Sequence, residues 1–461
     1  VLGLLPTYAF SIIFSPLLMS DEVSSIKTAW IFNFFYLIWS FFALLIDPLC
    51  KEFGSRKVAI IGGIATFLSI FLSAFAPTPD YLFLTFSLPA GISGAISYSL
   101  AFIVVSKYFK KHLGFALGIT TVGGSLSIFL APVISNYLLE IYGYEGAAII
   151  LGAITLNQCI GAMLYQPVEW HLKPIKSCSV AEKGYKDPTG WNRNPKETDN
   201  SESDNTKSST KIIKKVTINE NKSQADNTKL TNQNLKNILT NILKSTFKNF
   251  KLLKYMRVIF ISSSYAGFFI GYLNFDMWIP FVITNAGYSL EMAAWSSSLA
   301  SIGNVVGRIL MTVLSDRKFF NASYSYMFGL FLMGSTTIAF SFANDIKFYM
   351  ISTCFFGFSV GLTYSSSVTA MIKVEGVEDF PAVFGIAQFV QGPGGIIIGP
   401  LIGKIRDTTH SYKYSLWMLG VYEFLCVLMW ALIPFAEKFD NWKYGKAEKK
   451  EEFRTCLSLI E

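Results

Sequence analysis

Long apolar stretches alternate with short polar links over most of the chain. Twelve of these stretches can be drawn, at residues 1–18, 29–49, 57–76, 82–105, 113–136, 144–166, 257–281, 292–315, 320–343, 346–372, 381–404 and 412–436. Most are close to the ~20 apolar residues that an α-helix needs to cross the hydrocarbon core of a bilayer. All are predicted to be membrane-spanning helices, because an open sheet edge in lipid would leave backbone groups without hydrogen bonds.

The twelve stretches form two sets of six on either side of one long polar segment. This pattern divides the chain into an N-terminal six-helix half (1–166), a connector (167–256), a C-terminal six-helix half (257–436) and a tail (437–461). The predicted fold class is an all-α membrane protein of twelve helices in two halves. This layout is typical of secondary transporters, which bind substrate between their halves. The chain opens on Val1, so we interpret the first helix as incomplete; a cleaved signal peptide is the alternative.

Charge is scarce in the apolar stretches and concentrated in the connector. Charged residues make up 15% of the chain, against about 25% in soluble proteins. Residues 167–256 contain 17 Lys and Arg against 9 Asp and Glu, which accounts for the whole net charge of +8. The positive-inside rule then places the connector and both termini in the cytoplasm. The connector has few aromatic residues and no recognisable nucleic-acid-binding module, so we expect no nucleic acid partner.

Most of the connector has the composition of a disordered segment. Residues 232–254 are different, because apolar residues recur there at helical spacing among lysines. They predict a basic amphipathic helix on the inner leaflet of the membrane.

The cysteines and histidines indicate no cofactor and no metal. None of the six cysteines has CxxC spacing, and the three histidines lie at span ends or in the connector. No cluster of catalytic side chains falls at a shared membrane depth, so we do not expect an enzyme.

One loop pattern occurs at the same place in both halves. The first copy follows the second stretch as residues 51–57, and the second copy follows the eighth stretch as residues 315–318. They resemble the loop signature of the major facilitator superfamily, although the first has Lys51 where the signature has an acid. The residues that match the signature are Gly54, Arg56 and Lys57 in the first copy and Asp316 and Arg317 in the second.

Glycines and prolines also repeat between the halves. Gly124 corresponds to Gly392 and Pro132 to Pro400, both at an offset of 268 residues. Such residues mark helices that bend in alternating access, or helices that pack closely. The candidate gating or hinge residues are Gly123, Gly124, Gly392, Pro393 and Gly394.

A more specific resemblance begins before the fifth stretch. Residues 107–111 read Lys-Tyr-Phe-Lys-Lys and are followed by Ala116, Gly118 and Gly123. This segment resembles the signature that follows span four in the monocarboxylate transporter family. The sequence resembles the invertebrate members of that family more closely. The resemblance covers nearly all of both helical halves and implies a carrier of small organic anions.

Arg308 is the first candidate for substrate binding. It lies well inside the eighth stretch among apolar neighbours, where a charge is costly unless it faces a cavity or a partner. The guanidinium group offers a planar fork that matches a carboxylate, and the resemblance places the substrate-anion arginine of the family at this position. The alternative is that Arg308 only ties its helix to a neighbour.

Two positions depart from the family. The resemblance places the proton-accepting aspartate at Asn304, and places the lysine of span one at or beside Thr7, next to Tyr8. Asn304 hydrogen-bonds but does not titrate, so proton symport of the lactate type is in doubt. We still predict that Thr7, Tyr8 and Asn304 bind substrate together with Arg308.

Two acids inside apolar stretches, Asp276 and Glu423, are candidates for proton coupling. Other polar residues are candidates either for lining the route or for ordinary hydrogen bonds between helices. These residues are Asn157, Gln158, Tyr364, Ser365, Ser366 and Gln391.

The leading hypothesis is a plasma-membrane transporter of small organic anions that works by alternating access. Its expected partners are the anion, the lipid bilayer, protons if transport is coupled, and an ancillary membrane glycoprotein. One alternative is a carrier of neutral or zwitterionic solutes without proton coupling. Another is a membrane sensor or scaffold that does not transport.

Overall fold

The computed structural model describes residues 2–14, 25–166 and 237–444 of the chain. By their contacts, the described residues 2–14, 25–166 and 241–444 belong to one compact unit. The secondary structure of the described residues is helical. The predicted disorder of the connector lies almost entirely outside the described residues.

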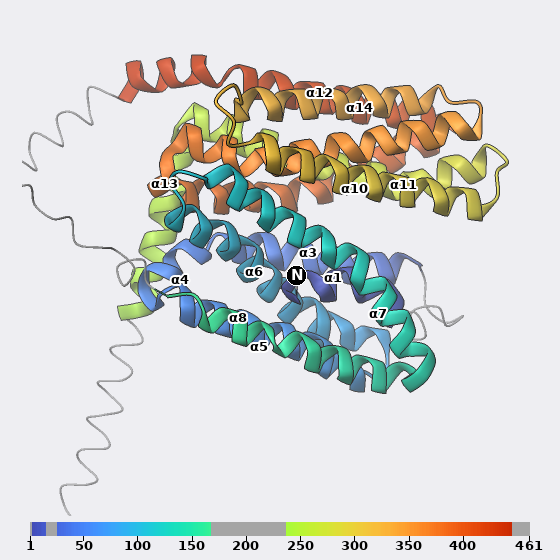
Figure 1. Cartoon of the computed structure of the whole chain (residues 1–461), viewed down its shortest axis with the longest axis horizontal. Helices are drawn as coiled ribbons and strands as arrows, with labels where there is room; N and C mark the ends of the chain where they lie inside the picture. Colours follow the sequence, from blue (N-terminus) through green and yellow to red (C-terminus); the bar gives the residue numbers. More distant parts are fainter. Residues whose placement is uncertain (1, 15–24, 167–236, 445–461) are drawn as a thin grey trace, which may run out of the picture. The chain divides into compact units, whose positions relative to one another are not determined.

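The N-terminal half consists of helices that run back and forth along one axis (Figure 1). They are α1 (Leu5–Ile13), α3 (Ser25–Ala43), α4 (Ile46–Phe53), α5 (Ser55–Phe71), α6 (Leu88–Tyr108), α7 (Leu113–Leu156) and α8 (Gln158–Met163). Helix α6 is preceded by a short π-helical turn, Phe83–Ser87.

The C-terminal half lies beside the N-terminal half and shares its axis (Figure 1). Its helices are α10 (Met256–Asn285), α11 (Leu290–Leu314), α12 (Ala322–Ser341), α13 (Ile346–Thr409) and α14 (Tyr412–Ala431). A further helix, 433–444, continues into the region predicted as the tail.

Two helices are each long enough for two membrane crossings. Helix α7 has 44 residues and turns at Gly143, where φ is 65°. Helix α13 has 64 residues and turns at Gly376, where φ is 81°. Positive φ favours glycine, because a β-carbon would meet the backbone. Among the described residues, seven helices are long and apolar enough to cross a membrane, or eight when α3 and α4, which are bent by 51°, count as one crossing.

Helices α11 and α13 approach each other more closely than side chains would allow. Glycines face each other there, with Gly303 and Gly307 on α11 and Gly357 and Gly361 on α13. A β-carbon at Gly357 would collide with the backbone of Ala300. Small residues permit this kind of contact between membrane helices. The contact fixes the helix that carries Arg308.

One end of the bundle, which we call the connector end, is where α10 begins and where α13 turns. The first backbone N–H groups of α10, at Met256 and Arg257, donate to the Asp440 carboxylate at 2.9 and 3.1 Å. Asp440 thus caps a helix N-terminus, where negative charge is favourable. Arg257 also lies 3.3 Å from Glu375, one residue before the turn of α13. These contacts join α10, α13 and helix 433–444.

Candidate functional site

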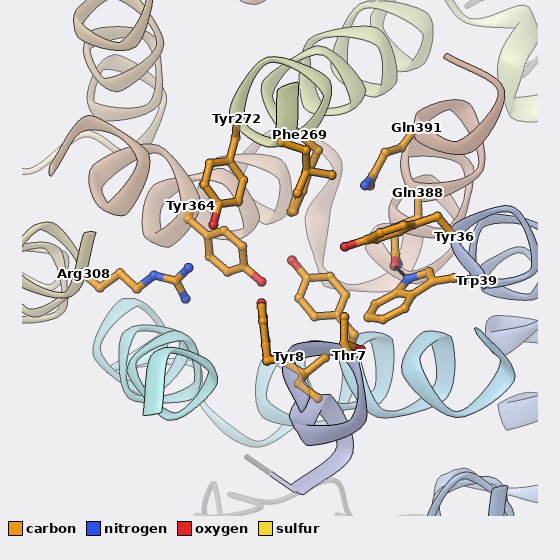
Figure 2. A pocket seen from close by; sticks show the side chains of 13 residues that line it. Thr7, Tyr8, Tyr36, Trp39, Phe269, Tyr272, Arg308, Tyr364, Gln388 and Gln391 are labelled. Atoms are coloured by element: carbon orange, nitrogen blue, oxygen red, sulfur yellow. Dashed lines mark hydrogen bonds between the residues drawn. The ribbon is translucent and has the colours of Figure 1, made fainter. Parts of the chain in front are cut away.

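A cavity lies between the two halves (Figure 2). Its lining residues are Leu4, Thr7, Tyr8, Tyr36, Trp39, Tyr98, Phe269, Tyr272, Leu273, Arg308, Tyr364, Gln388 and Gln391. Seven of these residues are aromatic, and the one charged group among them is Arg308. The cavity therefore suits a small solute with an apolar body and one anionic group.

Arg308 points into the cavity while being held from behind. Its side chain is 3% exposed, and its Nε donates to the Asn304 side-chain oxygen at 2.7 Å. Its Nη1 donates to the backbone carbonyl of Thr121, on α7 of the other half, at 2.8 Å. The guanidinium carbon lies 3.9 Å from the centre of the Tyr364 ring, within the range of a cation–π interaction.

These contacts use two of the five N–H groups of the guanidinium. Within the described residues, no acceptor is hydrogen-bonded to Nη2 of Arg308. Figure 2 shows the guanidinium directed between Tyr8, Tyr272 and Tyr364. The free edge can therefore receive a carboxylate, and both nitrogens already bonded fix its direction.

The other predicted substrate-binding residues fall into two groups. Thr7 and Tyr8, on α1, line the cavity directly. Asn304 is 6% exposed and is not among the lining residues. Its oxygen is used to hold Arg308, so the geometry gives it a positioning role.

Sequence reasoning missed most of the aromatic lining. Tyr36, Trp39 and Tyr98 come from α3 and α6, and no motif distinguishes them from other aromatic residues in apolar helices. Trp39 donates to Gln388 at 3.0 Å, and Gln388 donates to Ser99 at 2.9 Å, so this chain of bonds crosses between the halves twice.

Some of the residues predicted to line the substrate route do line the cavity, and the others form hydrogen bonds elsewhere. Tyr364 and Gln391 line the cavity. Gln158 instead donates to Ser97 and accepts from Thr66 within the N-terminal half. Ser365 bonds to Thr121 across the halves at 3.2 Å, Ser366 donates to a carbonyl of its own helix, and Asn157 does the same.

The two candidate acids have opposite surroundings. Asp276 lies one turn beyond Tyr272 on α10, is exposed, and is within electrostatic range of Tyr8 and Tyr36. Glu423, on α14, is 0% exposed, and neither carboxylate oxygen has a hydrogen-bond partner in the described residues. Its carboxyl group occupies the space beside Gly271, behind the cavity wall.

Two of the candidate hinge residues, Gly124 and Gly392, lie where the halves touch. A β-carbon on Gly124 would be 3.7 Å from Nη1 of Arg308, and Gly392 packs against Ser40 of α3. Gly394 packs against Ile270. Gly123 and Pro393 are half-buried neighbours, and the backbone of α13 stays helical through Pro393.

The two loop signatures have different contacts. Gly54 ends α4 with a φ of 83° and starts α5, and Arg56 and Lys57 are exposed on the first turn of α5. Lys51, which stands where the signature has an acid, pairs with Asp47 at 2.6 Å.

In the second signature, Asp316 reaches across to the N-terminus of α7. It accepts from the backbone N–H of Phe115 at 3.3 Å and lies 3.3 Å from His112. Arg317 is exposed beside it. Tyr98 and Tyr265 also bond across the halves, at 3.1 Å. The two halves are therefore closed against each other at the connector end.

The described residues contain no group of three or more His, Cys, Asp or Glu that could hold a metal ion. A helical bundle of two halves, with one arginine in the central cavity between them, is typical of membrane transporters. A family model of the Major Facilitator Superfamily matches residues 1–324 and 318–459. The chain therefore belongs to the major facilitator superfamily. This agrees with the predicted fold class.

Its curated relatives are monocarboxylate transporters, as the signature predicted. Monocarboxylate transporter 9 of Gallus gallus is 26% identical, over 90% of this chain and 86% of the relative. Monocarboxylate transporter 2 of Homo sapiens is 23% identical, over 92% and 80%. Monocarboxylate transporter 1 of Bos taurus is 23% identical, over 88% and 75%. These relatives are transporters and not enzymes.

Solved structures agree on the fold. The Escherichia coli fucose:proton symporter superposes with a TM-score of 0.62 at 11% identity, covering 94% of this chain and 96% of that one. A proton:xylose symporter superposes with a TM-score of 0.60 at 13% identity, covering 94% of each chain. At this identity the likeness concerns the fold alone.

Proposed function

We propose that this transporter carries small organic anions of the monocarboxylate type by alternating access, with the substrate carboxylate bound by Arg308. The single observation that carries the proposal is the free Nη2 edge of Arg308, which faces the cavity between the halves. An arginine is a costly group to bury in a membrane, and a bound anion compensates its charge. The names of the curated relatives support the same substrate class.

The aromatic lining narrows the substrate further. Tyr8, Tyr36 and Tyr364 and their neighbours surround the space next to Arg308 (Figure 2). Aromatic rings bind apolar and aromatic groups well. We therefore expect the preferred anions to have an aliphatic or aromatic body, and very small acids to be poorer substrates.

A zwitterionic substrate is the second candidate, on the evidence of one observation. Asp276 lies beyond the cavity, near Tyr8 and Tyr272, and could hold a cationic group while Arg308 holds the carboxylate. Because Asn304 is neutral, its hydrogen bond with Arg308 leaves the charge of the guanidinium uncompensated, so the guanidinium remains available for the carboxylate of either substrate class.

If protons are coupled to transport, Asp276 is the better of the two carriers. It is exposed near the cavity, whereas Glu423 is walled off with no hydrogen-bond partner in the described residues. A coupling carboxylate has to meet water on each side in turn. Replacing Asp276 by Asn should then remove the dependence of uptake on external pH, while Glu423→Gln should keep it.

The orientation follows from the connector. Its excess of lysines favours the cytoplasm, so we propose that both termini are cytoplasmic and that the protein resides in the plasma membrane. Closure at the connector end then corresponds to a cavity sealed from the cytoplasm. An ancillary membrane glycoprotein remains a candidate partner.

Uptake of labelled monocarboxylates tests the proposal. Cells expressing the full-length protein are compared with cells expressing Arg308→Ala or Arg308→Lys, normalised to the protein at the cell surface. Arg406→Gln, at the end of α13 and outside the cavity lining, is the matched control. We expect loss of uptake for Ala and a strong decrease for Lys, because an ammonium group cannot reproduce the fork. Equal uptake by wild type and Arg308→Ala would refute the assignment.

A further inference from the structure

Residues 241–254 form a basic strap across the connector end of the bundle. Residues 241–250 are helical and are followed by a 3-10 turn, Lys251–Lys254. The helix runs across the axis of the membrane-spanning helices, beside α4 and α13 (Figure 1). Two residues later α10 begins its membrane crossing at Met256. The strap therefore lies at the surface of the bilayer.

One face of the strap is fixed to the protein. Asn249 is 7% exposed and donates to the Asp47 carboxylate of α4 at 3.0 Å. The Phe250 ring lies 5.5 Å from the ring of Phe389 on α13. These contacts attach the strap to one helix of each half, so its other face has a defined direction.

The other face is apolar and open. Leu243 is 55% exposed and Phe247 is 68% exposed, and the two are one helical turn apart. An exposed apolar row on a helix that lies in the membrane surface matches the acyl boundary of the bilayer.

Lysines lie along one side of this row. Lys244, Lys248, Lys251 and Lys254 are all exposed, and no acidic residue occurs between 227 and 275. Within the described residues, none of the first three forms an ion pair. Four lysines directly before a membrane helix are complementary to anionic lipid headgroups.

We propose that residues 241–254 bind the anionic lipids of the inner leaflet, with Leu243 and Phe247 inserted at the acyl boundary and Lys244, Lys248 and Lys251 on the headgroups. The assignment to the inner leaflet rests on the orientation proposed above. Lipid bound there would contact the strap, and the strap contacts Asp47 in the N-terminal half and Phe389 in the C-terminal half. Both contacts lie at the end where the halves close.

Amide hydrogen exchange of residues 241–254 tests this proposal. The full-length protein is placed in nanodiscs of phosphatidylcholine alone or of phosphatidylcholine with phosphatidylserine. Phosphatidylserine should slow exchange in this segment at low salt, and high salt should reverse the effect. Nanodiscs present the lipid on both faces, so the result does not depend on orientation.

Two variants assign the effect to the strap. Each lysine near an anionic surface contributes about fivefold to affinity, so the triple change Lys244→Gln, Lys248→Gln and Lys251→Gln should lower it about a hundredfold and abolish the difference between the lipids. The double change Leu243→Asn and Phe247→Asn should weaken protection in both lipids. The matched control substitutes three exposed lysines at the opposite end of the bundle in the same way. These are Lys347, Lys404 and Lys413, and this variant should retain the difference in exchange between the two lipids.

Equal exchange in the two lipids for the wild type would overturn the proposal and leave the open face to a protein partner. A difference that persists in the Lys244, Lys248 and Lys251 triple variant would also overturn it, because other groups would then bind the lipid. The readout is exchange and not uptake, so failure of the transport proposal would leave this result interpretable.

Discussion

A single methyl group on Gly361 should displace Arg308. Gly361, on α13, faces α11, and a β-carbon there would lie 2.9 Å from the backbone nitrogen of Arg308 and 3.0 Å from the α-carbon of Gly307. Ordinary contact begins at 3.4 Å. The helices must therefore separate by at least 3.4 − 2.9 = 0.5 Å at Arg308. The carbonyl of Asn304 lies closer still, so the displacement at that turn is larger.

The displacement acts on the bonds that aim the guanidinium. The bond from Nη1 of Arg308 to the Thr121 carbonyl is 2.8 Å long, and a shift of 0.5 Å away from α7 would bring it beyond the usual limit of about 3.2 Å. Overpacking of this kind costs about 1–3 kcal/mol, against a gain of up to ~1 kcal/mol from the better helix propensity of alanine. We expect Gly361→Ala to be destabilised modestly and to lose more uptake than its stability alone explains.

The assay compares uptake per surface molecule with the thermal unfolding temperature of the purified protein. Gly403→Ala is the matched control, because Gly403 lies in the same helix and no atom is within 4 Å of its β-carbon position. It should keep uptake and stability. Wild-type uptake by Gly361→Ala would show that the close approach of α11 and α13 does not position Arg308, and the reasoning would be wrong.

Three further changes test other contacts. Asn304→Asp places a carboxylate against Arg308 Nε and compensates the charge of the guanidinium, so uptake of anions should fall; wild-type uptake would contradict this. Asp440→Ala removes the cap of α10 and should cost about 1 kcal/mol or more of stability, whereas Asp440→Asn should cost less; thermal unfolding decides. Asp316→Asn weakens the contact of His112 and Phe115 with the second loop signature, so cysteine labelling of the connector end should become faster, and an unchanged labelling rate would contradict it.

Arg308, the one charged residue in the cavity lining, could be picked out from the sequence. Arg308 is recognisable because a guanidinium is rare among apolar neighbours, and a lone charge in a membrane helix needs a reason. The turns of α7 and α13, at Gly143 and Gly376, also agree with the predicted links between spans. These features depend on the residue types at a few neighbouring positions, which a single sequence shows directly.

The aromatic lining was not predictable in the same way. In a membrane protein both the lipid-facing and the buried faces of a helix are apolar, so periodicity does not distinguish Tyr98 from an exposed aromatic such as Tyr137. The sequence does not indicate contacts between distant segments either. Asp440 caps α10 from 184 residues away, and Asn249 reaches Asp47 across 202 residues.

On the proposed function, Arg308 links substrate binding to the contact between the halves. Its Nε is bonded within its own helix, to Asn304, while its Nη1 is bonded to Thr121 of the opposite half. When the connector end opens, α7 must separate from α11, and the Thr121 bond is lost. A substrate carboxylate on Nη2 and Nη1 would replace that bond and so reduce the cost of separation. Because Asn304 is neutral, the guanidinium keeps its full charge for the substrate while its position stays fixed. On the proposed function, the same arginine binds the anion and lowers the barrier to opening.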